Sequence, residues 1–325
     1  MGQSTPVHTR SLGSFEELKD AVRGAHLDIV QLESGRFHGS LTHLSIDDLP
    51  VDFGTFSVGI RSQGILSGNR IAIGMLTGSA GRTTQWFREM HPGDVTVTPP
   101  GHDHDGRYYG GASYAVISLS PSEMHSFFSG EPRMQDENTW QQNLFRGAFR
   151  FSELPISRLN SILAGLQNRN TTLTNEASGF WKRSIIETMM ASVRLNLPSD
   201  RDGPLPSALK IIRKMEDYLV QSGTTPVHIS EICGALNVSR RTLHRAFHDA
   251  VGIGPVTFLQ RKRLCNIHSV LRTSDSATTT IAEIALQHGF LNLGRFSGYY
   301  RALFGEYPSE TFGKSHPNQD RTLSE

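Results

Sequence analysis

The stretch Val238-Ser-Arg-Arg-Thr-Leu-His-Arg-Ala-Phe247 determines the predicted fold of the C-terminal half of the chain. Ser239 is a preferred helix N-cap, and the residues after it repeat at helical spacing. The apolar residues Leu243, Ala246 and Phe247 share one face of this helix. The opposite face carries cations at positions i, i+3, i+4 and i+7, with one more at the N-terminal end: Arg241, His244, Arg245, His248 and Arg240. The pattern predicts a helix with one core face and one strongly basic face.

A short apolar helix, Ile229–Ala235, precedes this helix, and a tight turn at Leu236–Val238 joins the two. This is the helix-turn-helix layout, whose second helix enters the major groove of DNA. Arginine paired with guanine is the commonest specific contact in that groove, so the five cations of the basic face are candidate DNA contacts. A solvated basic face on a helical bundle is the alternative interpretation of the same residues.

The predicted helix-turn-helix unit occurs twice in the chain. Ile229-Ser-Glu-Ile232 recurs 52 residues later as Ile281-Ala-Glu-Ile284. With one residue inserted in the turn, five further positions correspond at an offset of 53. They pair Leu243, Phe247, Val251, Gly252 and Pro255 with Phe296, Tyr300, Phe304, Gly305 and Pro308. The sequence therefore predicts two copies of one supersecondary unit.

A long helix, Pro255–Arg272, links the two predicted copies. Its 18 residues would span about 27 Å, which is close to the ~34 Å between successive major-groove faces on one side of B-DNA. The copies differ, because Gly294 and Gly298 stand where the first copy has Arg241 and Arg245. We therefore expect the first copy to read bases and the second mainly to contact phosphate.

Charge is divided unevenly along the chain, although the net charge is only +1. Residues 1–204 carry 18 basic and 21 acidic side chains, whereas residues 205–325 carry 14 basic and 10 acidic ones. From Lys210 to Lys314 the counts are 13 basic and 8 acidic. An excess of positive charge in the helical half is what phosphate contacts require. Two cysteines, Cys233 and Cys265, are too few for a disulfide framework or a four-ligand zinc site, and we expect both to be reduced.

The N-terminal half has a different, strand-like pattern. A helix is predicted from Ser14, which has Glu17 three residues later as in a capping box, to Arg23. Short apolar runs separated by turn-forming residues follow it, and their spacing predicts a β-sandwich or barrel. The runs are Leu27–Leu32, Phe53–Ile60, Ile71–Leu76, Val95–Val97 and Ala115–Leu119.

Two amphipathic helices, Ile156–Leu166 and Gly179–Leu197, are predicted as an antiparallel pair beside the strands. Their apolar stripes fit either ordinary core or a dimer seam: Ile156, Leu159, Leu163 and Leu166, and Trp181, Ile185, Met189 and Val193. Residues 198–206 concentrate polar and helix-breaking residues, which is typical of a linker. The predicted fold class is α+β, with a β-rich domain at 1–197, a linker at 198–206 and an all-α domain at 207–315.

The sequence predicts neither a membrane span nor an export signal. Uninterrupted apolar runs end after about half a dozen residues, as in Ile71–Leu76, whereas a span needs about 20. Met1–Arg10 lacks the apolar core of a secretory signal. We expect a soluble, cytoplasmic protein.

Candidate ligand sites in the N-terminal half are few. His102 and His104 lie two residues apart, so a strand would point both to one side, where they could share a metal ion. A polar loop without a metal is the interpretation we favour. An effector pocket, which combines aromatic walls with polar anchors, has four candidate residues: Trp86, Arg88, Tyr108 and Tyr109. Ordinary sheet surface is the alternative for these four. No nucleophile and base are suitably spaced, so we expect no enzymatic activity and no cofactor.

In its C-terminal half the chain resembles the AraC/XylS family of bacterial transcription regulators. The resemblance covers about Ser207 to Phe312. Four stretches carry it: Ile229-Ser-Glu-Ile-Cys233, Val238–Phe247, Ile281-Ala-Glu-Ile-Ala-Leu-Gln-His-Gly-Phe290 and Phe304-Gly-Glu-Tyr-Pro-Ser309. The resemblance implies DNA contacts in both copies, at Arg241, His244 and Arg245 and near Leu293, Gly294, Arg295, Ser297 and Gly298.

The resemblance also implies that the N-terminal half is a cupin-like domain for effector binding and dimerisation, and that the protein activates transcription by contacting RNA polymerase. Leu293-Gly-Arg-Phe296 with Phe304-Gly-Glu306 is similar to the branch that includes ethanolamine-utilisation regulators, which points to an amine or another small catabolic ligand. The expected function is transcription activation at specific DNA sequences by a homodimer that binds a small molecule. The alternatives are a metal-binding cupin enzyme fused to a DNA-binding domain, and a DNA-binding protein without a ligand.

Overall fold

The computed structural model describes residues 3–4, 7–129, 143–145, 153–167, 172–195, 207–223, 227–275 and 278–312. The chain divides into two compact units. The N-terminal unit contains Met1–Ile29 and Phe37–Arg201, and the C-terminal unit contains Val30–Arg36 and Asp202–Glu325. The linker predicted at 198–206 lies outside the described residues, so the domain boundaries stay a prediction.

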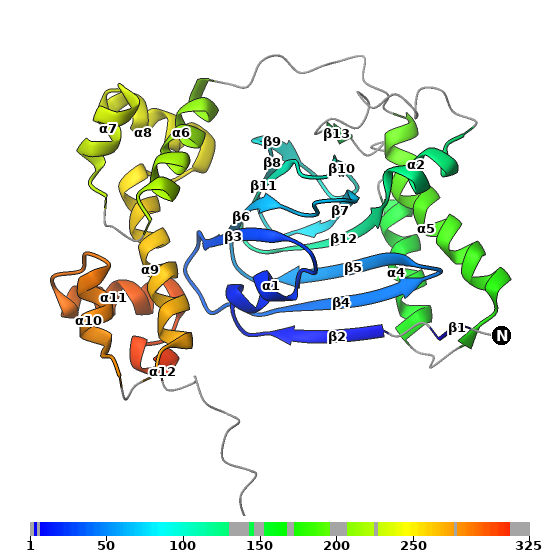
Figure 1. Cartoon of the computed structure of the whole chain (residues 1–325), viewed down its shortest axis with the longest axis horizontal. Coiled ribbons are helices and arrows are strands. Elements are labelled where there is room, and N and C mark those ends of the chain that lie inside the picture. The colour runs from blue at the N-terminus through cyan, green and yellow to red at the C-terminus, as the bar shows by residue number, and fades with distance from the viewer. Residues whose placement is uncertain are drawn as a thin grey trace, which may run out of the picture. The chain divides into compact units, whose positions relative to one another are not determined.

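The N-terminal unit is built on two antiparallel sheets (Figure 1). The larger sheet has seven strands in the order β13-β10-β7-β12-β5-β4-β2. Their bounds are β2 (Val7–Leu12), β4 (Gly39–Ile46), β5 (Leu49–Phe56), β7 (Ile71–Ser79), β10 (Val95–Thr98), β12 (Ala112–Leu119) and β13 (Asn143–Phe145).

The smaller sheet has five strands in the order β3-β6-β11-β8-β9. Their bounds are β3 (His26–Gln31), β6 (Ile60–Ile65), β8 (Thr83–Gln85), β9 (Arg88–Met90) and β11 (Asp103–Tyr108). A separate two-stranded pairing joins β1 (Gln3–Ser4) to β14 (Thr172–Leu173). The β-rich N-terminal half is confirmed, with more strands than the five apolar runs indicate.

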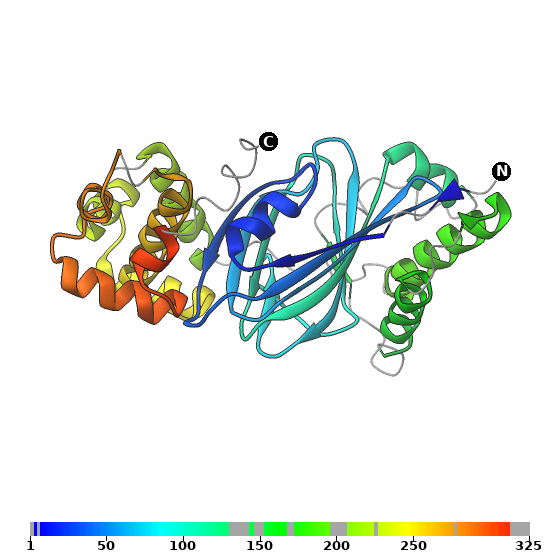
Figure 2. The same ribbon diagram turned by 90° about the horizontal axis from the view of Figure 1, so that it is seen from below.

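Helices cover one face of the larger sheet (Figure 2). The N-terminal unit contains α1 (Phe15–Ala21), α2 (Pro121–Phe127), α4 (Glu153–Gln167) and α5 (Asn175–Leu195). The stripe of α5, with Ile185, Met189 and Val193, is buried against strand residues such as Ile73 and Ile117. This burial supports the core interpretation of the stripe. On α4, Leu159 is buried as predicted, while the side chains of Leu163 and Leu166 lie outside the described residues.

One predicted strand is wrong. The run Phe53–Ile60 does not form a single strand, because β5 ends at Phe56 and β6 begins at Ile60. Ser57 turns the chain between them, and its backbone N–H donates to the carbonyl oxygen of His38 at 2.9 Å. Val58 is buried within this turn. Its apolar side chain extends the apolar run in the sequence past the end of β5, which is why a single strand was predicted.

The described part of the C-terminal unit is helical, apart from the segment Val30–Arg36. Its helices are α6 (Ser207–Gln221), α7 (Ile229–Leu236), α8 (Arg240–Val251), α9 (Pro255–Thr273), α10 (Ile281–Gln287), α11 (Leu293–Phe304) and α12 (Pro308–Phe312). In Figure 1, α9 joins the group α6–α8 to the group α10–α12. The predicted α+β fold class with a double helix-turn-helix is confirmed. Across the described ranges, none of the helices is long and apolar enough to cross a membrane.

The two helix-turn-helix copies begin alike. Glu231 in α7 accepts from the backbone N–H of His228 at 3.3 Å, and Glu283 in α10 accepts from that of Thr280 at 2.9 Å. Each glutamate thereby closes a capping box at the start of its helix. The repeated Ile-x-Glu-Ile motif thus combines a cap with a buried isoleucine one residue later.

The two copies also end alike. Helices α8 and α11 both stop at a glycine in the left-handed region, Gly252 and Gly305, each with φ of 72°. A residue with a Cβ is strained in this conformation, which explains glycine at both positions. Phe247 and Tyr300, which correspond in the repeat, are both completely buried. The internal repeat predicted from the sequence is confirmed in backbone and core.

The segment Val30–Arg36 belongs to the C-terminal unit. The backbone N–H of Gly35 donates to the carbonyl oxygen of Leu303 at 2.9 Å, and the amide nitrogen of Gln31 donates to the same oxygen at 2.8 Å. The domain boundary predicted from the sequence, at 198–206, does not indicate that an N-terminal segment belongs to the C-terminal unit.

Candidate nucleic-acid interface and effector cavity

The basic face of α8 is exposed to solvent. All five predicted contact residues are exposed: Arg240, Arg241, His244, Arg245 and His248. On the opposite face Leu243 and Phe247 are completely buried, and Ala246 is nearly so. The first turn of α8 contains no acidic residue. The helix therefore has the two faces that the sequence predicts.

Packing and capping fix how α8 presents this face. The Ser239 hydroxyl accepts from the backbone N–H of Thr242 at 3.0 Å, which sets the start of the helix. Phe247 packs against Phe258 of α9, with ring centroids 5.5 Å apart. The partial positive charge of the helix N-terminus adds to that of the arginines. These contacts hold a positively charged first turn at the surface, which suits a phosphate or a base edge.

Helix α11 presents a much less charged surface. Leu293 and Arg295 are exposed, and Ser297 is half-buried. Gly294 and Gly298 are also exposed, and because glycine has no side chain, few side chains project from this face of α11. The guanidinium of Arg301 donates to the hydroxyl of Tyr307 at 2.5 Å and lies over its ring. The predicted difference between the two copies therefore persists in the folded chain.

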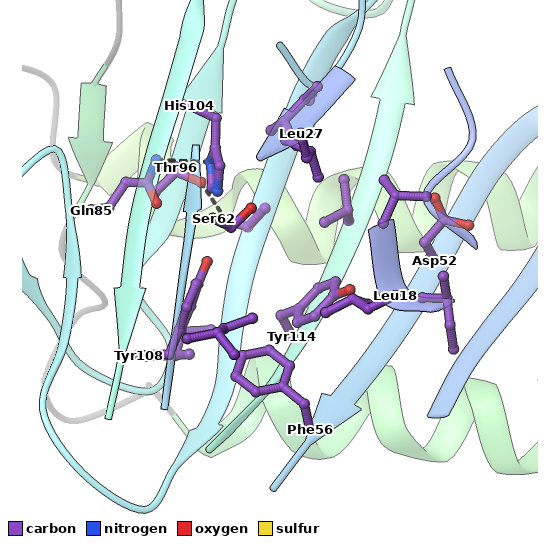
Figure 3. Close-up of a pocket in the computed structure, with 18 of the residues that line it drawn as sticks. Leu18, Leu27, Asp52, Phe56, Ser62, Gln85, Thr96, His104, Tyr108 and Tyr114 are labelled. Atoms are coloured by element: carbon purple, nitrogen blue, oxygen red, sulfur yellow. Dashed lines mark hydrogen bonds between the residues drawn. The ribbon is translucent and has the colours of Figure 1, made fainter. Parts of the chain in front are cut away.

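A cavity lies between the two sheets of the N-terminal unit (Figure 3). Its volume is about 110 Å³, and its walls are mostly apolar. Alternation along the strands creates it: on β12, Tyr114, Val116 and Ser118 face the cavity, while the residues between them face the helices. Its uncharged polar lining residues are Ser62, Gln85, Thr96, His104, Tyr108, Tyr114 and Ser118.

Glycines make room for the two tyrosines of the cavity. A methyl group on Gly54 would overlap the ring of Tyr114, and one on Gly106 would lie 2.7 Å from the hydroxyl oxygen of Tyr108. Phe56 completes an aromatic wall, with its ring centroid 5.2 Å from that of Tyr108 and 6.3 Å from that of Tyr114. Burial raises the pKa of both phenols, so both hydroxyls are neutral at physiological pH.

His104 is a buried, neutral imidazole in the cavity wall. Burial lowers its pKa to about 4, although the nearby Asp105 acts in the opposite direction. The amide nitrogen of Gln85 lies 2.9 Å from Nδ1. Because an amide nitrogen can only donate, Nδ1 accepts, and the ring proton is on Nε2. This polar pair is uncharged at neutral pH.

The favoured interpretation of His102 and His104 as a polar loop is wrong for His104. His104 lies within β11 and is buried, while His102 precedes the strand and is exposed. Asp105 and Arg107 point away from the cavity and are also buried. Arg61 donates to both carboxylate oxygens of Asp105, at 3.1 and 3.0 Å. Burial alone would raise the pKa of Asp105, but the two arginines hold it below its usual value. A strand with polar residues on both faces lacks the apolar signal of a buried strand.

Charged side chains line the cavity only beside α1. Asp52 lies on the opposite side of the cavity from Gln85 and His104 (Figure 3). Its carboxylate is 2.5 Å from Nδ1 of His43, and its side chain is 25% exposed. The other charged lining residue, Arg23, is exposed. The interior of the cavity is therefore lined by neutral groups.

The structure brings one of the four predicted effector residues into the cavity, namely Tyr108. Trp86 is buried in the turn between β8 and β9, where its indole N–H donates to the carbonyl oxygen of Asp103 at 2.8 Å. Arg88 and Tyr109 are half-buried outside the lining. The lining residues Gln85, His104 and Tyr114 went unpredicted, because strand register rather than sequence proximity brings them together. Within the ranges given above, no three His, Cys, Asp or Glu side chains form a group that could hold a metal.

A buried neutral imidazole predicts a pH-dependent stability. The unfolded chain takes up a proton at His104 near pH 6.5, while the folded chain resists it until about pH 4. The stability is thus present above pH 6.5 and is lost as the pH falls towards 4. Between pH 7 and pH 4 the loss due to this residue is about 3 kcal/mol.

The variant His104→Gln removes this titration. The difference in unfolding free energy between the two proteins is therefore expected to shift by that amount over this pH range. Urea unfolding followed by tryptophan fluorescence measures it, since all three tryptophans precede residue 198. A difference that stays constant with pH would contradict the buried neutral imidazole.

Residues 232–314 match the family model described as a helix-turn-helix domain. The "Probable thc operon regulatory protein" of Rhodococcus erythropolis is 34% identical over 107 residues, which are 33% of this chain and 32% of that protein. The XylDLEGF operon transcriptional activator of Pseudomonas putida is 31% identical over 106 residues, which are also 33% of this chain and 32% of that protein. The chain spans about a third of the length of these relatives.

Among solved structures, that of the AraC-like transcriptional activator CuxR is 16% identical in sequence, with 81% of this chain and 96% of that chain covered at a TM-score of 0.44. The matched residues 232–314 include helices α8, α9, α10, α11 and α12. The C-terminal part of the chain therefore contains a helix-turn-helix domain that is similar to part of these regulators.

Proposed function

We propose that this chain is a transcription regulator that binds specific DNA sequences and responds to a small effector. The observation that carries the proposal is the exposed basic face of α8, set on a buried helix-turn-helix core. Long cationic side chains in the first turns of such a helix reach base edges, and the same charge attracts phosphate. A regulator of this kind acts in the cytoplasm, on double-stranded DNA, and catalyses no reaction.

The linking helix supports binding to two adjacent grooves by one chain. Helix α9 has 19 residues, which correspond to about 28 Å at ~1.5 Å per residue. Successive major-groove faces lie ~34 Å apart on one side of the duplex. Two recognition helices at the ends of this rod suit a pair of neighbouring sites. We also propose that the protein acts as a homodimer and activates transcription through RNA polymerase.

The cavity supports the effector part of the proposal. A mostly apolar pocket with a few polar groups is the usual form of a small-molecule site. Its neutral polar pair and aromatic wall lie in a domain separate in sequence from the helix-turn-helix copies. A ligand bound only by the folded domain would raise its melting temperature, which a thermal-shift screen of small molecules measures.

The two copies are expected to contribute differently to DNA binding. Arg241→Ala is expected to weaken binding to a preferred site by about 10- to 100-fold and to reduce discrimination at one or two base pairs. Arg295→Ala is expected to weaken binding to every DNA sequence by about the same factor, because it removes a phosphate contact.

Fluorescence anisotropy with duplexes from the DNA upstream of the protein's own gene, mutated one base pair at a time, measures both effects. Equal loss of discrimination in the two variants would refute the difference between the copies. If the wild-type protein bound these upstream duplexes no more tightly than a scrambled duplex, the proposed function would be refuted.

A further inference from the structure

The cavity of the N-terminal unit is suited to one chemical class of ligand. We infer that the effector is an uncharged molecule with one aromatic ring and a neutral hydrogen-bonding group such as a hydroxyl. Benzyl alcohol is the simplest probe of this class. The inference rests on the proposed function as an effector-responsive regulator and specifies what the effector is.

The size of the cavity limits the ligand to about one ring. Its volume is about 110 Å³. An apolar cavity of about 150 Å³ holds benzene, so the space here is on the scale of a single six-membered ring. Leu27 and Ile60 from the smaller sheet and Val116 from the larger one enclose it. A ligand of two fused rings would exceed this volume.

The aromatic wall favours a ring over an aliphatic chain. Phe56 and Tyr108 meet edge to face, with an angle of 83° between their rings, and Tyr114 is tilted by 49° to Phe56. Aromatic rings prefer edge-to-face and offset contacts, and three rings at these angles offer both edges and faces to a fourth. The glycines opposite the two tyrosines keep this arrangement open.

The polar groups of the cavity select a neutral ligand. Gln85, the neutral His104, and the hydroxyls of Tyr108 and Tyr114 can all form hydrogen bonds, but none carries charge at pH 7. A hydroxyl group can both donate to and accept from such partners. Beside these neutral groups, a carboxylate or an ammonium group would lose its hydration without gaining an opposite charge, which disfavours binding strongly.

The two charged lining residues do not change this selection. Asp52 is hydrogen-bonded to His43, and the opposite charge of Arg23 acts on its carboxyl group. They lie on the side of the cavity away from Gln85 and His104 (Figure 3), and both Asp52 and Arg23 are accessible to water. Their charge is therefore largely balanced before any ligand arrives.

Three ligands that share a ring and differ in charge test the inference. Isothermal titration of the full chain at pH 7.5 is carried out with benzyl alcohol, benzoate and benzylamine. Benzyl alcohol is expected to bind at least about tenfold more tightly than either ion. Equal or tighter binding of benzoate or benzylamine, or no binding of benzyl alcohol, would overturn the inference.

Neighbouring tyrosines provide a matched pair of variants. Tyr108→Phe removes a hydroxyl that lines the cavity, whereas Tyr109→Phe makes the same change outside it. Tyr108→Phe is expected to weaken benzyl alcohol binding by about three- to tenfold, and Tyr109→Phe to leave it unchanged. Val116→Phe, which fills the cavity, is expected to abolish binding. Equal effects of the two tyrosine changes, or binding that survives in a folded Val116→Phe protein, would place the ligand elsewhere and overturn the inference.

DNA binding by the same preparation separates this inference from the proposed function. If specific DNA binding is present while an ion is the preferred ligand, the inference fails and the regulator proposal stands. If the wild-type chain lacks specific DNA binding, the proposed function fails whatever the titrations give.

Discussion

The double variant Arg241→Ala/Arg245→Ala is expected to lose specific DNA binding. Both side chains are exposed on the same face of α8, one turn apart, and their neighbours on the opposite face are buried. A bidentate contact between arginine and guanine contributes about 1–3 kcal/mol to discrimination. Removing two such contacts is therefore expected to reduce affinity for a preferred site by about two orders of magnitude or more. Anisotropy titration against specific and scrambled duplexes measures the loss.

Lys214→Ala provides the matched control for this variant. Lys214 is an exposed cation on α6, outside both recognition helices. Its removal lowers the net charge without removing a side chain of the proposed interface. We expect affinity to change little. If one lysine on α6 mattered as much as the two arginines on α8, overall charge rather than a recognition face would explain the binding.

Phe247→Ala is expected to unfold the first helix-turn-helix copy. Phe247 is completely buried and packs against Phe258 of α9. Truncation of a buried phenylalanine costs about 3–5 kcal/mol, because the cavity that remains is only partly refilled. This is a large part of the stability of a small helical domain. Hydrogen exchange of α8 amides, followed by mass spectrometry of peptides, is expected to show lost protection.

The corresponding residue of the second copy gives a mild control. Tyr300 is also completely buried, and its hydroxyl donates to the Thr311 hydroxyl at 2.7 Å. Tyr300→Phe keeps the ring and removes the hydroxyl with this bond, at a cost of about 1 kcal/mol. Protection in α11 is expected to survive this change. Retained protection of α8 amides in Phe247→Ala would show that Phe247 does not anchor the first copy.

The helical half was predictable because its local signals agree with one another. Helix α8 combines a serine cap, an apolar face of period 3.6 and a glycine after its last turn, and each of these appears directly in the sequence. The repeat supplied a second test, since Gly252 and Gly305 had to adopt the same conformation if the copies were alike. They do, with the same φ.

The cavity was largely unpredictable because its residues meet through strand register. Gln85 and His104 come from β8 and β11, and Tyr114 comes from the other sheet. The residues next to them in the sequence form no motif that would identify any of the three as lining a cavity. Strand β11 was mistaken for a loop because Asp105 is polar and yet buried, where it is compensated by Arg61. Aromatic character identified Tyr108, but it also suggested Trp86, which is buried in a turn.

Selection of bound sequences from a pool of random duplex DNA tests the central claim most directly. The full chain is expected to enrich two short blocks about one helical turn apart, with the stronger base preference in the block contacted by α8. Repeating the selection with Arg241→Ala is expected to weaken the preference in that block alone. A pool that shows no enrichment, or a preferred site that is unchanged in Arg241→Ala, would contradict base recognition by the first helix-turn-helix copy.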